Sequence, residues 1–371
     1  MESARVDRTA GRRRVRLFPF VGTARYGPAK RRRTYRFSHA RWPMSKTRIG
    51  VIGPGSFCTN YHLRNLQARS DVDIAAVCDI SEERLRAIRA NLPETRTFTD
   101  HRALLDADLV DGIIVSTPNQ HHFTPCQNAL QCDIPVLVDK PVTVTGSDAE
   151  TLVGLSKSRN VALMTAFTRH FMPSTEHVRR EIRSGTLDVQ HITAIQRHSP
   201  LKNTVEDGGM LHRRTVHIFD VIPWLMGSPI VRVSASIQYE TGHLEEEYVD
   251  GRLELANGVT CNLLCIKNCD DSQDEVSLYG RTHSFRIDKQ QIERMEGKSG
   301  WQAPGDLTTY GTSTDHFVDA QKGVTFDPNA PFHDPHSEDG LQSIRVLEAV
   351  HEAGRTGKSI DIPIVEQRAK M

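Results

Sequence analysis

The chain has 371 residues, 38% of them hydrophobic and 25% charged, and its formal net charge at pH 7 is +1. This near-balance hides an uneven distribution: residues 1–43 hold 12 Arg and one Lys against Glu2 and Asp7, so residues 44–371 carry a net charge of −10. An acidic body argues against a nucleic-acid partner, and no apolar run approaches the roughly 20 residues of a transmembrane helix. The length is sufficient for two domains with substantial cores.

Residues 1–43 lack any helix or strand pattern long enough to predict an element. We expect this basic segment to be a disordered or non-native extension, and we exclude it from the fold. An Arg-rich, acid-poor start is also typical of a transit peptide. A third interpretation places the biological start at Met44, because Met44-Ser-Lys-Thr leads directly into the first strand.

The seven cysteines are odd in number and scattered along the chain. This pattern favours reduced thiols in an intracellular, cytoplasmic protein over a disulfide framework. Cys261, Cys265 and Cys269 fall four residues apart on a predicted strand, which separates their sulfurs by roughly 13 Å, too far to share one metal. The His-rich stretch 332–336 is expected to be a polar loop, with a zinc site as the alternative. We therefore predict no metal site.

The first predicted element is a short apolar strand, 49–52, which stops at a glycine-rich turn and is followed by a helix at 57–68. A strand, a tight glycine turn and a helix start together present backbone N–H groups and the positive end of a helix dipole, which suits a pyrophosphate. The pattern is close to the dinucleotide-binding G-x-G-x-x-G. Its residues are Gly53, Gly55, Ser56, Phe57 and, at the third glycine position, Cys58.

The second predicted strand, 73–77, ends in Cys78-Asp79, which places a carboxylate at its carboxyl end, 26 residues beyond Gly53. A carboxylate there accepts both ribose hydroxyls of an adenosine and repels a 2′-phosphate, which favours NAD over NADP. The alternative is that Asp79 only caps the following helix, predicted over 81–92.

Strand and helix patterns alternate up to residue 166, which is typical of βαβ units and a parallel sheet. We therefore predict an α/β Rossmann domain over 44–166. One continuous apolar strand runs into the turn Ser116-Thr117-Pro118-Asn119, and the next runs into Asp139-Lys140-Pro141. Open α/β sheets bind ligands at the carboxyl ends of their strands, so both turns are candidate cofactor contacts.

Residues 167–371 have a different pattern. The segment 230–240 alternates apolar and polar side chains, and Asn257-Gly258 is a hairpin signal. This predicts a C-terminal α+β domain with an open, mostly antiparallel sheet. Further strands are expected at 252–256, 259–267, 276–279 and 284–288, with helices flanking the sheet at 211–226, 314–322 and 338–353.

Two further features could carry chemistry. Lys140 follows an apolar strand at the ligand-binding edge of the sheet, where an ammonium could stabilise the charge of an alkoxide oxygen. Two glycines open the helix that follows residue 207, on which Arg213, His217 and Asp220 fall at i, i+4 and i+7, on one face. Titratable groups on one face suit acid–base catalysis, although an interior histidine beside a surface ion pair gives the same pattern.

Together these features resemble the Gfo/Idh/MocA oxidoreductases over about residues 46–363. The markers are Gly-Val-Ile-Gly-Pro-Gly at 50–55, the turn 116–119 with His122 after it, Asp139-Lys140-Pro141, and the helix from Gly208-Gly209 to Gly227.

The chain also departs from the family pattern. The family's helix reads Gly-Gly-Gly-x-Leu-x-Asp-x-Gly-x-His-x-x-Asp; His217 and Asp220 match it, whereas Arg213 replaces the catalytic Asp and Thr215 replaces a Gly. The segment 166–173 resembles the family's Gly-Phe-Asn-x-Arg-Phe-x-Pro, which lies beside the nicotinamide and the substrate. In it His170 replaces the Arg, and Arg169 lies one position earlier; Asp139 replaces the Glu of the family's Glu-Lys-Pro.

The resemblance implies an NAD-dependent oxidoreductase that moves hydride between the nicotinamide and a sugar, cyclitol or sugar-acid-like substrate. It also implies a homo-oligomer built through the C-terminal sheet. His217 would move the hydroxyl proton, Lys140 would stabilise the oxygen, and the Arg213 cation would depress the pKa of His217. NAD is the expected cofactor and NADP the less favoured one.

The candidate site residues fall into three groups. The catalytic candidates are Lys140, His217 and Arg213. The cofactor-binding candidates are Gly53, Gly55, Ser56, Phe57, Asp79, Ser116, Thr117, Pro118, Asn119, His122, Asp139 and Lys140. The substrate-binding candidates are Arg169, His170, Arg213 and Asp220.

Two other functions remain open at this point. One is the NAD-dependent glycosidase branch of the family, in which oxidation is transient and a sugar is released. The other is a non-catalytic NAD-binding sensor, which the replacement of the catalytic Asp by Arg213 makes plausible.

Overall fold

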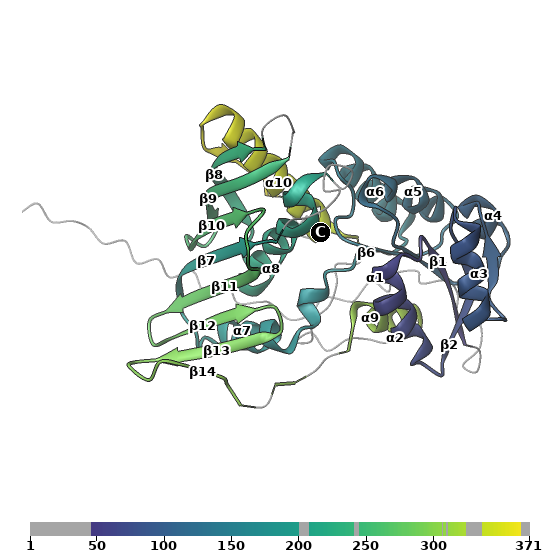
Figure 1. The fold of residues 1–371 in the computed structure, drawn as a ribbon, viewed down its shortest axis with the longest axis horizontal. Coiled ribbons are helices and arrows are strands. Elements are labelled where there is room, and N and C mark those ends of the chain that lie inside the picture. Colours follow the sequence, from purple (N-terminus) through teal and green to yellow (C-terminus); the bar gives the residue numbers. More distant parts are fainter. Residues whose placement is uncertain are drawn as a thin grey trace, which may run out of the picture. The chain divides into compact units, whose positions relative to one another are not determined.

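The computed structural model describes residues 46–199, 208–240, 245–305, 307–308, 311–323 and 336–364. The basic segment 1–43, Met44, and residues 332–335 of the His-rich stretch lie outside the described residues. The described part contains a six-stranded and a nine-stranded sheet (Figure 1). The predicted fold class, a Rossmann sheet followed by an open and mostly antiparallel sheet, is therefore confirmed.

The six-stranded sheet has the order β3-β2-β1-β4-β5-β6, and every neighbouring pair is parallel. Its central strands are apolar throughout because helices cover both faces, and β4 and β5 are buried at every residue. The strand order reverses between β1 and β4, which is where such sheets bind ligands. The strands are β1 (Thr47–Ile52), β2 (Val72–Cys78), β3 (Arg96–Phe98), β4 (Gly112–Val115), β5 (Val136–Val138) and β6 (Leu163–Thr165).

The helices of this half follow the predicted alternation. Among them, α3 and α6 each begin with a side-chain N-cap. The Ser81 hydroxyl accepts a hydrogen bond from the backbone N of Arg84, and the Thr145 hydroxyl accepts one from the backbone N of Asp148. The helices are α1 (Ser56–Cys58), η1 (Thr59–Leu63), α2 (Arg64–Gln67), α3 (Glu82–Asn91), α4 (His101–Asp106), η2 (Asn119–His121), α5 (Phe123–Gln131) and α6 (Gly146–Arg159). The single helix expected over 57–68 is thus interrupted, because η1 is a turn of π-helix. A π turn is a common feature of functional sites.

The nine-stranded sheet has the order β14-β13-β12-β11-β7-β10-β9-β8-β15. Only β7 and β10 pair in parallel; the other pairs are antiparallel. The predicted hairpin at Asn257-Gly258 joins β9 and β10, and Gly258 has a φ of +88°, which glycine adopts at no steric cost. The strands are β7 (Val189–Arg197), β8 (Ile230–Tyr239), β9 (Glu246–Leu255), β10 (Thr260–Ile266), β11 (Gln273–Gly280), β12 (His283–Asp288), β13 (Gln291–Glu296), β14 (Trp301–Gln302) and β15 (Ile360–Asp361).

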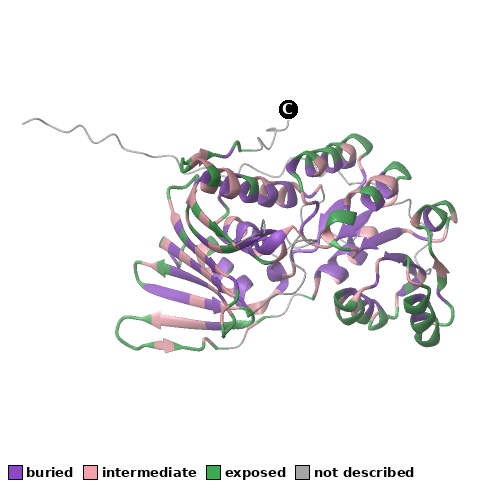
Figure 2. Cartoon of the chain, turned by 45° about the horizontal axis from the view of Figure 1, so that its top comes forward, coloured by how far each residue is buried: buried purple, intermediate pink, exposed green. Residues whose placement is uncertain are grey.

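One face of the nine-stranded sheet is covered by helices, and its other face carries polar and half-buried side chains. Buried and more exposed residues alternate along β10, as expected for a half-covered sheet, and Figure 2 shows buried and intermediate residues on the strands of this sheet. No helix in the described ranges is both long and apolar enough to cross a membrane. The helices are η3 (Thr168–Phe171), α7 (Pro173–Ser184), η4 (Leu211–Thr215), α8 (Val216–Met226), α9 (Ser313–Gln321) and α10 (Glu338–Thr356).

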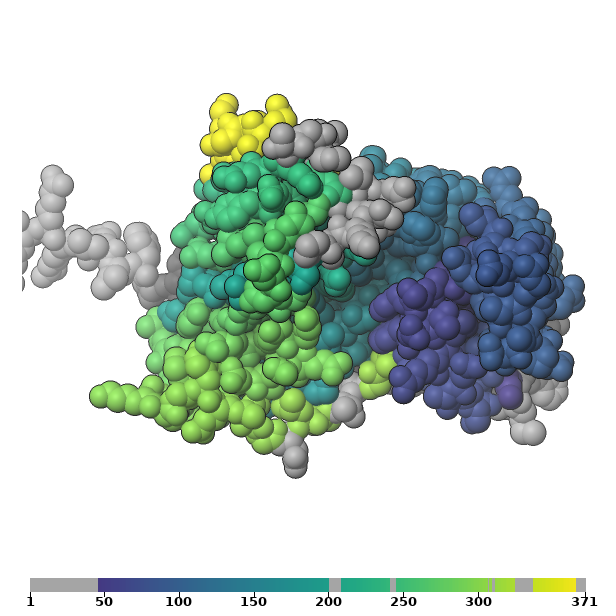
Figure 3. All heavy atoms as spheres, viewed as in Figure 1, coloured from purple at the N-terminus to yellow at the C-terminus, as the bar shows by residue number. Residues whose placement is uncertain are grey.

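The expectation that the helix at 314–322 flanks the antiparallel sheet is wrong. Phe317 and Val318 of α9 are fully buried in one apolar cluster with Ile49 and Val51 of β1, and α9 lies against α2, as the space-filling view also shows (Figure 3). Burying a phenylalanine side chain contributes about 1.5–3 kcal/mol. The chain therefore returns to the Rossmann half after completing most of the second sheet.

Candidate functional site

The glycine turn after β1 is shaped for close approach. Gly53 has a φ of +78°, and a Cβ added there would lie 2.6 Å from Thr117 Cγ2 and 2.8 Å from the Thr117 backbone N. Only glycine fits that position. A Cβ on Gly55 would meet nothing within 4 Å, and Gly55 lines the cavity described next. The turn therefore leaves bare backbone at the entrance to a helix, as phosphate binding requires.

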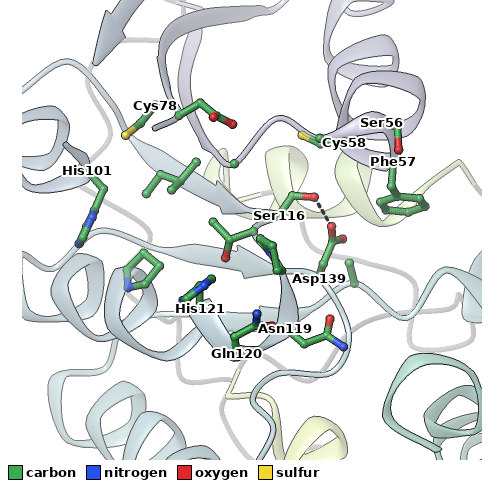
Figure 4. Close-up of a pocket in the computed structure, with 18 of the residues that line it drawn as sticks. Ser56, Phe57, Cys58, Cys78, His101, Ser116, Asn119, Gln120, His121 and Asp139 are labelled. Carbon is green, nitrogen blue, oxygen red and sulfur yellow. Dashed lines mark hydrogen bonds between the residues drawn. The ribbon is translucent and has the colours of Figure 1, made fainter. Parts of the chain in front are cut away.

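A cavity of about 870 Å³ lies at the carboxyl ends of the Rossmann strands, within the range of ligand sites. Figure 4 shows a close-up of its lining. Lys140, Arg213 and His217 also line it, so β5, η4 and α8 bound the same space. Of the predicted cofactor residues, those that line it are Gly53, Gly55, Ser56, Phe57, Asp79, Ser116, Thr117, Pro118, Asn119, Asp139 and Lys140.

Asp79 lies at the predicted end of its strand, but the residue that caps the following helix is Ser81. Asp79 is buried at the end of β2 and lines the cavity. One carboxylate oxygen accepts from the backbone N of Ser81 at 2.8 Å, and the other pairs with Arg84 Nη1 at 2.7 Å. Arg84 itself is half exposed and lines the cavity. Sequence reasoning missed this arginine because it lies one helical turn beyond the carboxylate.

His122 lies beneath the cavity and does not line it. Its ring is fully buried, with Nδ1 2.7 Å from the Pro141 carbonyl oxygen and Nε2 2.8 Å from the Thr117 carbonyl oxygen. Burial lowers its pKa. His122 therefore joins the two ligand-binding turns from behind, and its neighbour His121 is the residue that lines the cavity.

Asp139 is the centre of a hydrogen-bond chain that sequence reasoning did not find. His62 Nε2 lies 2.9 Å from Asp139 Oδ1, and His62 Nδ1 lies 2.8 Å from the Thr314 hydroxyl. The Ser116 hydroxyl donates to the other oxygen of Asp139 (Figure 4). Burial favours a higher pKa for Asp139, but His62 and Ser116 outweigh it and keep that pKa below its usual value. These hydrogen bonds hold in place the turn that carries Lys140.

Lys140 is half-buried in the cavity wall, and its Nζ donates to the Arg213 carbonyl oxygen at 2.6 Å. Burial lowers the pKa of its ammonium to about 8, although Asp139 opposes the change. Arg214, Arg169 and Arg213 lower that pKa further. A lysine with a pKa near the working pH can hold or release a proton in the cavity.

Arg213 and His217 line the cavity, but Asp220 does not. The helix begins with the π-helical turn η4, which contains Arg213, and continues as α8, which contains His217 and Asp220. His217 Nδ1 is buried and has no hydrogen-bond partner among the described residues. Burial lowers the pKa of His217 well below its usual value, and the positive charges of Lys140, Arg169 and Arg214 lower it further. The sequence predicted that Arg213 would lower the pKa of His217, whereas in the structure Arg214 does so.

The remaining predicted substrate residues lie behind the cavity. His170 Nε2 and an Asp220 oxygen are 2.9 Å apart, both side chains are buried, and the His170 ring stacks on Trp224 at 4.4 Å. Burial raises the pKa of Asp220 and lowers that of His170, so it disfavours the charged form of each. Arg169 is buried in an ion pair with Asp274 of β11, a partner far away in sequence.

His170, Asp220 and Asp339 are the one group in the described ranges whose ligand atoms could converge on a metal, within 4.8 Å of one another. His170 and Asp220 already bond to each other. The nearby Arg169 and Arg179 act on this pair as cations. They oppose the binding of a further positive charge.

The cavity residues fit a dinucleotide. The Gly53–Gly55 turn provides a bare backbone for a pyrophosphate, and Asp79 provides a carboxylate for a ribose. The Thr117 hydroxyl is buried and has no hydrogen-bond partner among the described residues, so a polar ligand group can satisfy it.

Comparisons with known proteins agree with this geometry. Residues 47–167 match the model of the oxidoreductase family with an NAD-binding Rossmann fold, and residues 175–286 match the Gfo/Idh/MocA C-terminal domain. An inositol 2-dehydrogenase of Corynebacterium glutamicum (strain R) is 29% identical over 224 residues, which cover 58% of this chain and 66% of that protein. Inositol 2-dehydrogenase 1 of Saccharopolyspora erythraea is 26% identical over 338 residues, 87% of this chain and 98% of that protein.

Solved structures share the fold. The aldose-aldose oxidoreductase of Caulobacter crescentus, complexed with glycerol, has a TM-score of 0.75 and 19% identity, covering 85% of this chain and 100% of its own. The WlbA dehydrogenase of Bordetella pertussis, in complex with NADH and UDP-GlcNAcA, has a TM-score of 0.75 and 19% identity, covering 86% of this chain and 99% of its own. The chain belongs to the Gfo/Idh/MocA family of NAD-binding oxidoreductases.

Proposed function

We propose that this protein is an NAD-dependent oxidoreductase that interconverts a secondary alcohol and a ketone on a sugar, cyclitol or sugar-acid-like substrate. The observation that carries the proposal is that Lys140, with a pKa of about 8, and the half-buried His217, with a lowered pKa, both line one dinucleotide-sized cavity. The names of the relatives, inositol 2-dehydrogenases, support a polyhydroxy substrate.

Lys140 is proposed to hold the reacting oxygen. Its ammonium is kept in place by the Arg213 carbonyl oxygen at 2.6 Å and by the fixed Asp139 beside it in the chain. When the substrate hydroxyl loses its proton, negative charge develops on oxygen, and a fixed cation in a partly desolvated site stabilises that charge. The lowered pKa also allows Lys140 to donate or accept the proton itself near neutral pH.

His217 is proposed to take the hydroxyl proton. Its imidazole is neutral at physiological pH because burial and three surrounding cations disfavour the protonated ring. A neutral imidazole can accept a proton, and the low pKa means that it returns that proton readily. The His170–Asp220 pair is proposed to hold α8 and η3 together behind it.

The cofactor is proposed to bind along the Rossmann edge of the cavity. The Gly53–Gly55 turn, with Ser56 and Phe57, would hold the pyrophosphate, Asp79 would hold the adenosine ribose, and the turn 116–119 would border the rest. Bound NAD supplies the hydride acceptor, and NADH the hydride donor.

Assembly and location are part of the same proposal. The polar face of the nine-stranded sheet includes the half-buried Ile195 and Leu264, which are direct neighbours on β7 and β10. Apolar side chains on an uncovered sheet face support its use as a subunit interface. Free thiols at all seven cysteines support a cytoplasmic location.

The test is a panel of polyols, cyclitols, sugars and sugar acids offered to the purified protein with NAD, with nicotinamide reduction followed by absorbance. Reduction that depends on one class of polyhydroxy compound is the expected result. Release of a sugar from a glycoside without net NAD reduction would instead identify the glycosidase, and tight NAD binding without turnover across the panel would identify the sensor.

A further inference from the structure

One end of the cavity is formed by the end of β2 and the first turn of α3, where Asp79, Ile80 and Arg84 line it. Among the described residues, the other carboxylate that lines the cavity is that of Asp139, which follows β5, three strands away from β2 in the sheet order. Neighbouring strands lie about 4.8 Å apart, so Asp139 is roughly 14 Å away. A polar ligand group at the end of β2 therefore meets Asp79 and Arg84.

The carboxylate of Asp79 is turned toward the protein. Its side chain is only 3% exposed. One oxygen accepts from the backbone N of Ser81 at 2.8 Å, and the other pairs with Arg84 Nη1 at 2.7 Å. The pair with Arg84 has no net charge, so the repulsion that an isolated carboxylate would exert on an anionic ligand is offset at this point.

The guanidinium of Arg84 is the part of the pair that faces the cavity. The Arg84 side chain is 50% exposed and lines the cavity. Its Nη1 bonds to Asp79, whereas Nε and Nη2 have no hydrogen-bond partner within the described ranges. Because a guanidinium carries five N–H donors in a fixed plane, the bond to Asp79 orients the group and leaves several donors available to a ligand.

This geometry bears on the choice between the two nicotinamide dinucleotides. NADP differs from NAD by a phosphate on the 2′ oxygen of the adenosine ribose. In Rossmann sites a carboxylate at the end of the second strand accepts the ribose hydroxyls, and a nearby arginine accommodates the 2′-phosphate. Here Asp79 and Arg84 place both groups at one point of the cavity.

We propose that Arg84 sets the cofactor preference of this site: its guanidinium, held by Asp79, also receives the 2′-phosphate, so the protein binds NADP nearly as tightly as NAD. The inference rests on the proposed oxidoreductase function and widens its cofactor range. The ribose of NAD uses the lone pairs that remain on the Asp79 carboxylate. The 2′-phosphate of NADP gains charge-assisted bonds from Arg84 instead.

The experiment measures the Kd of NAD and of NADP for the full chain by titration calorimetry. We expect the two Kd values to lie within about tenfold of each other, and the Kd of NADP to rise more steeply with salt, because its additional contact is between charges. Arg84→Gln should raise the Kd of NADP about tenfold or more, which is the loss of one charge-assisted contact. The Kd of NAD should change by no more than about threefold, because a half-exposed ion pair contributes little by itself.

Arg89→Gln is the matched control. Arg89 is an arginine of the same helix α3, its side chain is 47% exposed, and it does not line the cavity. The control should leave both Kd values unchanged. Arg84→Lys keeps the charge but not the planar fork, so its Kd for NADP should lie between those of the wild type and Arg84→Gln.

Two results would overturn the role of Arg84. One is a preference for NAD of a hundredfold or more that Arg84→Gln leaves unchanged. The other is an equal weakening of NAD and NADP by Arg84→Gln, which would show that Arg84 only supports Asp79. Neither result touches the oxidoreductase, because the readout is binding and not turnover. A wild type that binds neither dinucleotide would overturn the oxidoreductase, and this inference with it.

Discussion

The ammonium of Lys140 lies where the fold disfavours a charge. Its pKa is about 8 in the folded protein, whereas an unfolded chain gives a lysine about 10.4. Because the folded value is the lower one, the folded state resists protonation. The Lys140 charge therefore destabilises the folded state by its full amount below pH 8, and this destabilisation disappears as the pH rises through the unfolded pKa.

Lys140→Met should therefore raise the melting temperature at pH 7, since the substitution removes a disfavoured charge and keeps a similar volume. The difference from the wild type should narrow between pH 8 and about 10.4. Differential scanning calorimetry across this range measures it, with Lys298→Met, at an exposed site, as the control. A melting temperature below that of the wild type at pH 7 would show that the bond to the Arg213 carbonyl outweighs the cost of the charge.

The pH dependence of alcohol oxidation should report the two proposed groups separately. The rate should fall at low pH with an apparent pKa well below 6.5, where His217 becomes protonated, and fall again above about pH 8, where Lys140 loses its proton. His217→Asn should remove the acidic fall, and Lys140→Arg should move the alkaline fall beyond the measurable range. An acidic fall near pH 6.5 would contradict the lowered pKa of His217.

At the level of elements, the first helix does more than present a phosphate-binding turn. Through η1 it places His62 between Thr314 of α9 and Asp139 at the end of β5, so one buried ring joins three elements. His62→Ala should lower the free energy of unfolding by about 1–3 kcal/mol, because it leaves buried polar partners unsatisfied. Urea denaturation measures this, and His191→Ala, at a half-buried site on β7, should cost less.

The order of elements was predictable from the sequence, but their internal irregularities were not. Apolar strands ending at Gly53, Asp79, Ser116 and Asp139 predict the Rossmann sheet because each strand is locally encoded. The π turns η1 and η4 have no such local signal, since their residues also suit an ordinary α-helix. Of the three residues predicted to share one helix face, Arg213 and His217 line the cavity and Asp220 does not.

At the scale of the whole molecule, the site depends on partners that lie far apart in the chain. Arg169 pairs with Asp274, and Asp139 reaches Thr314 through His62. Motifs reveal the residues beside a turn or a strand end, but not which distant residue completes a pair. For the same reason the return of α9 to the Rossmann core could not be predicted from the helix pattern alone.

The uncovered face of the nine-stranded sheet provides a test at this scale. Leu264→Lys places a charge beside Ile195 on the polar face and should shift the protein from oligomer to monomer, because a buried unpaired charge is costly at an interface. Light scattering at micromolar concentration measures this, and Arg252→Lys is the control on the same face. A wild type that is already monomeric would contradict the interface.

The most direct test of the proposed chemistry is the turnover of Lys140→Met on the substrate that the wild type uses best. NAD affinity, measured by calorimetry, should stay close to that of the wild type, because the turns at Gly53–Gly55 and Asp79 are untouched. Turnover should fall about a hundredfold or more, which is the usual effect of losing one fixed electrostatic donor at a reacting oxygen. Full activity of Lys140→Met with normal NAD binding would contradict the proposal that this lysine stabilises the reacting oxygen.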